Sequence, residues 1–443
     1  MSKMTAEAVA SVPQDTAAKS SLTRIVVASA VGTALELYDF LLYAYIASLI
    51  FEKLFFPRFD PLVGTILVFG SFSVGIISRP LGGLLFGHFG DRIGRKYTLV
   101  ITMLLMGISS AAIGLLPGYA QIGIAAPALL ITFRILQGIA IGGESVGGVL
   151  MTIENVGPEK RGFYGSIIQA AGPVGSISAS IALLLVSYLP NDALLSWGWR
   201  LPFLFSLPLL IIGFYVRSRV DESPEFEEAA RRRKILRVPV MEVFRRHKSA
   251  TFVVLLASMA DTSLFYLATV FTLSYGTKTL GIPREALSNA IMLGSIVSLF
   301  TTPLLGAWSD RIGLRRMYII GLSLLIVGIY PFFLMLESRS GLLAGTAIVA
   351  AIGIVHSMMW ASSASYFPGL FDANVRFSGT SLGKQVGTVM GGGLIPLIAT
   401  GLLATGSNGV VLLCGYFALL AGVAILVVFL GEKRGGMPRA PLA

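Results

Sequence analysis

The sequence has little charge and almost no cysteine, and both shortages narrow the class of protein. Charged residues make up 13% of the 443 residues, about half the fraction typical of soluble globular domains. Together with 55% hydrophobic residues and a mean hydropathy of +0.80, this excludes an ordinary soluble domain and indicates a polytopic membrane protein. The single cysteine, Cys414, excludes an internal disulfide and a cysteine-based metal site.

Alternation of apolar and polar residues over about ten positions, the pattern of membrane β-strands, is also missing. Instead the chain holds long apolar runs of about 20 residues, enough to cross a hydrocarbon core of about 30 Å as helices. The twelve runs are 25–50, 61–86, 97–116, 126–150, 162–188, 200–217, 250–275, 286–308, 317–336, 342–366, 379–404 and 409–431. We therefore expect an all-α protein with twelve transmembrane helices.

A short polar loop occurs twice. Its first copy, Gly87-His-Phe-Gly-Asp-Arg-Ile-Gly-Arg-Lys96, joins the second and third runs, and its second, Gly306-Ala-Trp-Ser-Asp-Arg-Ile-Gly-Leu-Arg-Arg316, joins the eighth and ninth. Asp91 and Asp310 are 219 positions apart, close to half the chain. This repeat predicts two pseudo-symmetric six-helix bundles, 25–217 and 249–431, joined by a cytoplasmic linker, 218–248, and flanked by cytoplasmic tails, 1–24 and 432–443.

The distribution of lysine and arginine predicts the orientation. With the N-terminus in the cytoplasm, 25 of the 34 cations lie in cytoplasmic segments and 6 in outer loops, as the positive-inside rule requires. We expect a multi-pass protein of the bacterial inner membrane with both termini cytoplasmic. The net charge of +11 is then explained by the orientation of the protein in the membrane, and no nucleic-acid partner is expected. The basic run 231–234 in the linker reads as a solvated tether, or alternatively as a lipid-binding patch.

Ionisable side chains inside the apolar runs are costly, so each is a candidate for function. Asp39 and Arg134 fall at similar depths, about 21 and 18 Å from the cytoplasmic side at 1.5 Å per residue. If an anionic substrate draws Arg134 away, Asp39 loses its counter-charge and takes up a proton. The alternative is a static pair that joins two helices. Glu36, one turn before Asp39 on the same face, shares or replaces the proton role.

The other candidates are assigned to substrate binding. Arg79 either pairs with Glu144 or binds a substrate carboxylate through its planar fork. In the second half, Lys384 either holds an anionic group or forms a salt bridge to Asp261. The remaining candidate contacts to the substrate are Gln137, Gln169, His356 and Tyr43. The alternative for the two glutamines is hydrogen bonding between helices, and the alternative for the histidine is a packing role.

Several motifs resemble those of the major facilitator superfamily and, within it, of the metabolite:proton symporter family of shikimate, α-ketoglutarate, citrate and proline/betaine carriers. They are the Gly87–Lys96 loop, Gly32-Thr-Ala-Leu-Glu-Leu-Tyr-Asp-Phe40, Arg79-Pro-Leu-Gly-Gly83, Gln137-Gly-Ile-Ala-Ile-Gly-Gly-Glu144, Trp197-Gly-Trp-Arg200 and Glu222-Ser-Pro-Glu-Phe226. The chain departs from shikimate-type members at Lys384, where an aromatic residue is usual before Gln385, and from the family at Leu37, where Trp is common in the first span. The resemblance favours Asp39 as the proton group.

The loop motif and nearby charges predict a cytoplasmic latch for the outward-open state, broken when the two bundles rock. Asp91 is expected to cap the helix that follows it and to meet arginines nearby. The residues assigned to gating are Gly87, Asp91, Arg92, Gly94, Arg95, Glu144, Glu154, Arg161, Glu222, Asp310, Arg311 and Arg376.

The function predicted from these features is uptake of a small organic acid with protons by alternating access, by a monomer that is not an enzyme and needs no cofactor or metal. One alternative is a proton-driven exporter of the same fold, suggested by a partial antiporter motif, Gly172-Pro-Val-Gly175. The other is a membrane sensor without transport, which the absence of a soluble domain disfavours.

Overall fold

The structure is a computed structural model that describes all residues except 1–13, 59–60, 232–238, 407 and 432–443. The described residues form helices and connecting turns without a β-strand, and the all-α prediction is confirmed. Most of the basic run 231–234, the tail 432–443 and the first part of the tail 1–24 lie outside these residues. Residues 14–24 belong to the first helix, because it begins at Gln14 and not at residue 25.

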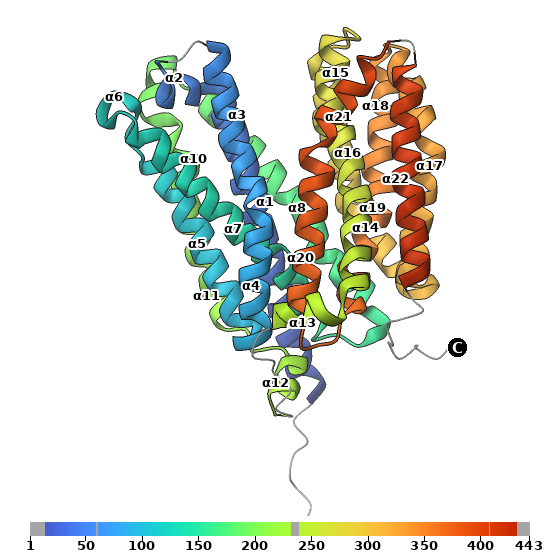
Figure 1. The fold of residues 1–443 in the computed structure, drawn as a ribbon. Coiled ribbons are helices and arrows are strands. Elements are labelled where there is room, and N and C mark those ends of the chain that lie inside the picture. The colour runs from blue at the N-terminus through green and yellow to red at the C-terminus, as the bar shows by residue number, and fades with distance from the viewer. Residues whose placement is uncertain (1–13, 59–60, 232–238, 407, 432–443) are drawn as a thin grey trace, which may run out of the picture.

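The first half of the chain forms the helices named α1 to α11 in Figure 1. They are α1 (Gln14–Ile46), α2 (Glu52–Phe55), α3 (Pro61–Ile77), α4 (Arg79–Ile93), α5 (Arg95–Leu115), α6 (Tyr119–Ile122), α7 (Ala125–Ile153), α8 (Arg161–Ser187), α9 (Asn191–Ala193), α10 (Arg200–Leu204) and α11 (Ser206–Ser218). The predicted span 61–86 is interrupted at Ser78, between α3 and α4.

The linker and the second half form the remaining helices. They are α12 (Pro224–Arg231), α13 (Pro239–Arg246), α14 (Lys248–Tyr266), α15 (Thr272–Lys278), α16 (Arg284–Ile312), α17 (Leu314–Glu337), α18 (Gly341–Ala350), α19 (Ser357–Tyr366), α20 (Arg376–Thr388), α21 (Ile395–Leu403) and α22 (Gly409–Gly431). In the described part of the chain, 11 helical segments are long and apolar enough to cross a membrane. The interrupted pair α3 and α4 occupies the place of the remaining predicted span.

The helices of the two halves gather into two bundles (Figure 1). The bundles meet at the end that carries α12 and α13, which we call the latch end and which is predicted to face the cytoplasm. They diverge toward the end that carries α6 and α15, which we call the far end. If the latch end faces the cytoplasm, as the sequence predicts, this arrangement is the outward-open state.

Small residues allow the bundles to touch at the latch end. A Cβ atom added to Gly87 of α4 would lie 2.7 Å from the Cα atom of Ser378 in α20. One added to Gly306 of α16 would lie 2.0 Å from the hydroxyl oxygen of Ser166 in α8. Because these distances are below van der Waals contact, α4 and α20, and likewise α8 and α16, pack at a separation that only glycine permits.

Irregular turns interrupt several second-half spans. Short π-helical segments follow α14 (Leu267–Phe271), precede α19 (Ala351–His356) and follow α20 (Val389–Gly393). Such turns shift the side chains beyond them around the helix axis and occur often at functional sites.

Candidate functional site

At the latch end, a carboxylate of the first bundle binds the second bundle. The two carboxylate oxygens of Asp91 accept hydrogen bonds from the backbone N–H groups of Phe377 (3.2 Å) and Ser378 (2.8 Å), in the first turn of α20. The prediction that Asp91 caps the helix following it was wrong, since the capped helix belongs to the other bundle. A buried anion at a helix N-terminus interacts favourably with the helix dipole, so this contact holds the bundles together.

The second copy of the motif makes the reciprocal contact. The two carboxylate oxygens of Asp310, near the end of α16, accept hydrogen bonds from the backbone N–H groups of Gly162 (2.7 Å) and Phe163 (2.8 Å), in the first turn of α8. Each bundle therefore supplies one carboxylate and one helix N-terminus. The glycines that follow the two aspartates in the motif, Gly94 and Gly313, have φ angles of 115° and 100°, which favour glycine at these turns.

Arg95 lies at the centre of a buried charge network beside Asp91. Its Nε atom is 3.2 Å from Glu154, its Nη2 atom is 3.4 Å from Asp91, and it donates to the carbonyl of Ala373 (2.9 Å) across the interface. Arg376 of the second bundle also binds Glu154, at 3.3 Å. Burial alone raises the pKa of Glu154, but the charges of Arg95 and Arg376 outweigh it and hold this pKa below its ordinary value.

The remaining gating candidates are placed unevenly. Glu222 accepts hydrogen bonds from the backbone N–H groups of Arg95 (3.0 Å) and Lys96 (3.2 Å), and so caps α5. Arg161 donates to the carbonyl of Val156 (3.3 Å), while its own carbonyl accepts from Ser365 (2.6 Å) across the interface. Two further candidates, Arg92 and Arg311, are exposed.

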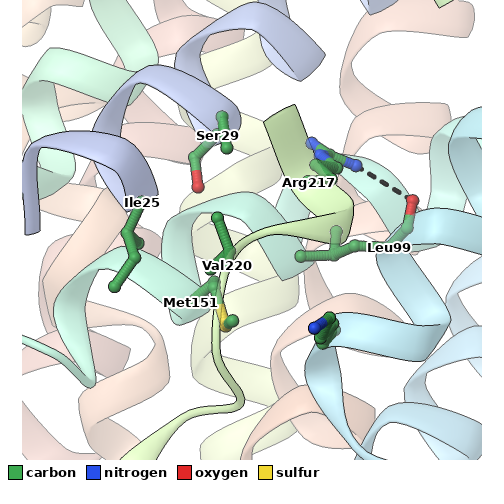
Figure 2. Close-up of a pocket in the computed structure, with 8 residues that line it drawn as sticks. Ile25, Ser29, Leu99, Met151, Arg217 and Val220 are labelled. Carbon is green, nitrogen blue, oxygen red and sulfur yellow. Dashed lines mark hydrogen bonds between the residues drawn. The ribbon is translucent and has the colours of Figure 1, made fainter. Parts of the chain in front are cut away.

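Glu144 takes part in an ion pair within the first bundle. Both of its carboxylate oxygens accept hydrogen bonds from the guanidinium of Arg217, and one also accepts from the hydroxyl of Thr102 (2.8 Å). Arg217 donates as well to the carbonyl of Leu99 (2.9 Å), beside a small cavity lined by Ile25, Ser29, Met151 and Val220 (Figure 2). The predicted pairing of Glu144 with Arg79 was therefore wrong. Glu144 belongs to the internal structure of the bundle and makes no contact in the latch among the described residues.

Asp39 and Arg134 are both buried, with 2% and 1% of their surfaces exposed, but they have different partners. Asp39 accepts a hydrogen bond from the hydroxyl of Ser206 (2.6 Å). Arg134 donates to the amide oxygen of Gln137 (2.8 Å), and its guanidinium carbon lies 3.8 Å from the ring centre of Tyr43. Within the described part of the chain, no salt bridge joins Asp39 to Arg134 in this conformation.

The contacts of Arg134 with Gln137 and Tyr43 continue into further hydrogen bonds within the first bundle. The amide nitrogen of Gln137 donates to the hydroxyl of Ser110 (2.5 Å), and the hydroxyl groups of Tyr43 and Ser71 share a hydrogen bond of 2.6 Å. Gln137 thus bonds between helices, the alternative left open by the sequence. The Nε and Nη2 atoms of Arg134 are buried without a hydrogen-bond partner in the described chain, so this guanidinium can still receive an anion.

Arg79 and Glu36 face the interface between the bundles. The guanidinium carbon of Arg79 lies 4.4 Å from the ring centre of Phe40, and its Nε atom has no hydrogen bond within the described chain. The Oε2 atom of Glu36, on α1, is also buried without a partner there. Arg79 and Glu36 are close enough to interact electrostatically, but no salt bridge joins them in the described part of the protein.

The second bundle places Asp261, His356 and Lys384 near one another. The Nε2 atom of His356 lies 3.3 Å from a carboxylate oxygen of Asp261, and the ammonium nitrogen of Lys384 lies 4.8 Å from the ring centre of Trp360. Within the described chain, no salt bridge joins Lys384 to Asp261, the alternative left open by the sequence. The indole N–H of Trp360 donates to the carbonyl of Gln169 (3.5 Å) in the first bundle.

Several residues of this region were missed from the sequence. Ser206 and Trp360 carry no charge, and Arg217 falls where the sixth apolar run ends, so it was counted with the linker cations. Gln385, next to Lys384, donates to Ser145 (2.6 Å) across the interface. No described group of three or more His, Cys, Asp or Glu side chains is arranged to hold a metal ion.

Comparisons with known proteins agree with this arrangement. The sequence matches the family profile described as Major Facilitator Superfamily over residues 30–383 and 270–442. It is 38% identical over 397 residues to the shikimate transporter of Escherichia coli K12, covering 88% of this chain and 90% of that protein. It is 37% identical over 420 residues to the inner membrane metabolite transport protein YhjE of the same organism, covering 94% and 95%. The solved structure of the proton:xylose symporter XylE superposes with a TM-score of 0.72 at 16% identity, covering 94% of this chain and 96% of that one.

Proposed function

Because the chain belongs to the Major Facilitator Superfamily and is a multi-pass membrane transporter of metabolites, we propose that it imports a small organic acid together with protons. The observation that carries the proposal is the state of three buried or partly buried cations. Arg79, Arg134 and Lys384 have no salt bridge to a carboxylate among the described residues, and the first two also have unbonded guanidinium nitrogens. A cation in this state inside a membrane is suited to bind an anionic substrate.

Proton coupling is assigned to the buried carboxylates of α1, Asp39 and Glu36. Glu36 has an oxygen without a hydrogen bond among the described residues, and Asp39 is held by hydroxyl groups, that of Ser206 at 2.6 Å and that of Ser110. Arg134 is near enough to act on Asp39 through space, so movement of Arg134 toward a bound anion would favour protonation of Asp39. The names of the shikimate transporter and of the proton:xylose symporter support an acid substrate and a proton-driven mechanism.

The conformational cycle follows from the latch. With the bundles joined at the latch end, substrate and proton enter from the far end. Rocking of the bundles then breaks the contacts of Asp91 and Asp310 and opens the latch end. We place the latch end in the cytoplasm and the protein, as a monomer, in the bacterial inner membrane, in keeping with the positive-inside distribution of its cations.

The test uses right-side-out vesicles containing the full-length protein, with external pH recorded after addition of shikimate, benzoate, α-ketoglutarate, citrate or betaine singly. Alkalinisation with an acid, absent from empty vesicles and lost in a variant carrying Asp39→Asn and Glu36→Gln, is expected. Acidification would instead support the exporter. Labelled uptake of every carried compound without any pH change would refute proton coupling.

A further inference from the structure

One cation from each bundle faces the same buried carboxylate. Arg79 of α4 and Lys384 of α20 both interact electrostatically with Glu36, and they interact with each other. The two helices are in direct contact, since a Cβ atom added to Gly83 of α4 would lie 3.1 Å from the carbonyl oxygen of Ser381 in α20. Arg79 and Lys384, which we call the cation pair, therefore belong to contacting helices of the two bundles.

Glu36 depends on this cation pair for its counter-charge. The other charged groups that act on it are Glu144 of α7 and Arg217 of α11. These two are paired to each other through both oxygens of Glu144, so Arg217 is already neutralised. The Oε2 atom of Glu36 makes no hydrogen bond among the described residues. An anion that occupies Arg79 and Lys384 would leave Glu36 buried and without compensation.

The charge that a substrate adds to the cation pair can be counted directly. The carboxylates that act on Lys384 are Glu36 and Asp261. Asp261 has a separate neighbour in His356, at 3.3 Å. A substrate with one carboxylate adds one negative charge to this region, and uptake of one proton by Glu36 offsets it. A dicarboxylate would add a second negative charge that this proton does not offset.

Aromatic rings lie next to Lys384. The ring of Trp360 is stacked on that of His356, with centres 5.6 Å apart and planes inclined by 22°. The ring of Phe265 lies 5.0 Å from His356 on centres. The bond from the Trp360 indole to the carbonyl of Gln169 fixes the plane of the first ring. A flat or cyclic carbon skeleton would pack on such rings while its carboxylate reached Lys384.

We propose that Arg79 and Lys384 together bind the carboxylate of a cyclic monocarboxylic acid, and that Glu36, released from both cations, takes up the transported proton. The proton adds to a carboxylate oxygen of Glu36 on the side from which the acid enters. When the acid anion leaves on the other side, the two cations return to Glu36 and the proton departs to that side. This inference rests on the proposed function and adds the residues, the substrate class and a stoichiometry of one proton per acid.

The test measures labelled shikimate, a cyclic monocarboxylate, in proteoliposomes holding the full-length protein. In Glu36→Gln, which resembles the protonated state, accumulation driven by a pH gradient should be lost while exchange of internal for external shikimate continues. In Lys384→Gln, the KM for shikimate should rise by about tenfold or more, as expected from loss of a charge-assisted contact, and Lys384→Arg should restore much of it. Lys278→Gln, which removes an exposed cation at the far end, is the matched control.

Charge balance supplies an independent readout that needs no variant. Carriage of one proton with one monocarboxylate moves no net charge, so a potassium diffusion potential set with valinomycin should leave the initial rate of shikimate uptake unchanged. A rate that rises with an inside-negative potential would overturn the stoichiometry.

The outcomes separate the inference from the function on which it rests. If the wild-type protein moves no protons with any of the five test compounds, the proposed function fails. The inference alone fails in either of two cases, provided that the wild-type protein carries shikimate with protons. In the first, Glu36→Gln still accumulates shikimate when a pH gradient is applied. In the second, Lys384→Gln has the same KM for shikimate as the wild type. Size-exclusion profiles and the conservative Glu36→Asp variant distinguish misfolding from loss of coupling.

Discussion

Replacement of Asp91 by Asn is expected to shift the protein away from the latched conformation. The carboxylate of Asp91 is 1% exposed and accepts two backbone hydrogen bonds from the first turn of α20. An asparagine has one amide oxygen and no charge, so it loses one bond to a charged group and the attraction to the helix N-terminus. A loss of about 2 kcal/mol follows, which lowers the ratio of latched to unlatched molecules by roughly 30-fold.

The assay is a distance measurement between spin labels on the two bundles. Cys414 is the single cysteine of the chain, so Cys414→Ala provides a background for labels at Ile124→Cys and Leu342→Cys, which are 71% and 80% exposed and lie close to α6 and in α18 at the far end (Figure 1). Asp91→Asn should add a population with a shorter distance, because the far ends approach when the latch end opens.

The reasoning has a matched control and a clear refutation. Asp221→Asn removes an exposed carboxylate from the linker that begins after α11 and should leave the distance distribution unchanged. The double variant Asp91→Asn with Asp310→Asn should move the distribution further, since the two contacts are separate and their effects add. If the double variant has the distribution of the parent, these carboxylates do not hold the bundles together.

Three further predictions concern stability and pH. Glu144→Gln leaves Arg217 without its buried partner and should destabilise the protein by about 3–5 kcal/mol, measured as a lower unfolding temperature in detergent. The control, Glu227→Gln, breaks the exposed pair with Arg231 and should destabilise the protein by less than about 1 kcal/mol. Gly82→Ala places a Cβ atom 1.9 Å from the carbonyl oxygen of Ile139 and should lower the unfolding temperature, while Gly422→Ala, which meets nothing within 4 Å, should not. The pKa of Glu154 is held below its ordinary value by Arg95 and Arg376, so its contribution to the stability of the latch should be complete above about pH 4.3. That contribution should disappear as the pH at the latch end falls further, and the spin-label distances should change with it. If the distances in Glu154→Gln change with acid as much as those in the parent, the prediction is contradicted.

The sequence could identify the groups that matter but not their partners. Asp91 and Asp310 were recognised because a polar motif repeats with one spacing, and the buried ions stood out because they interrupt apolar runs. The helix that Asp91 caps is 286 positions away, a distance over which local pattern carries no information. The motif therefore predicted a cap but assigned it to the neighbouring helix.

The depth of a residue along its helix also does not determine which side chains it contacts. Counting residues placed Asp39 and Arg134 at similar levels, yet their direct partners are Ser206 and Gln137, because lateral position depends on tilt and rotation. Arg217 lies at the last turn of α11, where hydropathy no longer separates a buried cation from a loop cation. Its burial of 96% depends on Glu144 in another helix, and that partner becomes visible only once the helices are packed.

The reciprocal contacts of Asp91 and Asp310 have a mechanical consequence. A single contact would leave two rigid bodies free to pivot about it in every direction, but two separate contacts define a line. With α4 joined to α20 and α16 joined to α8, rotation about the line through both aspartates is the motion that keeps both of these contacts. Such a rotation would widen or narrow the far end without separating the latch end, so the far end could close over a bound molecule before either carboxylate leaves its helix.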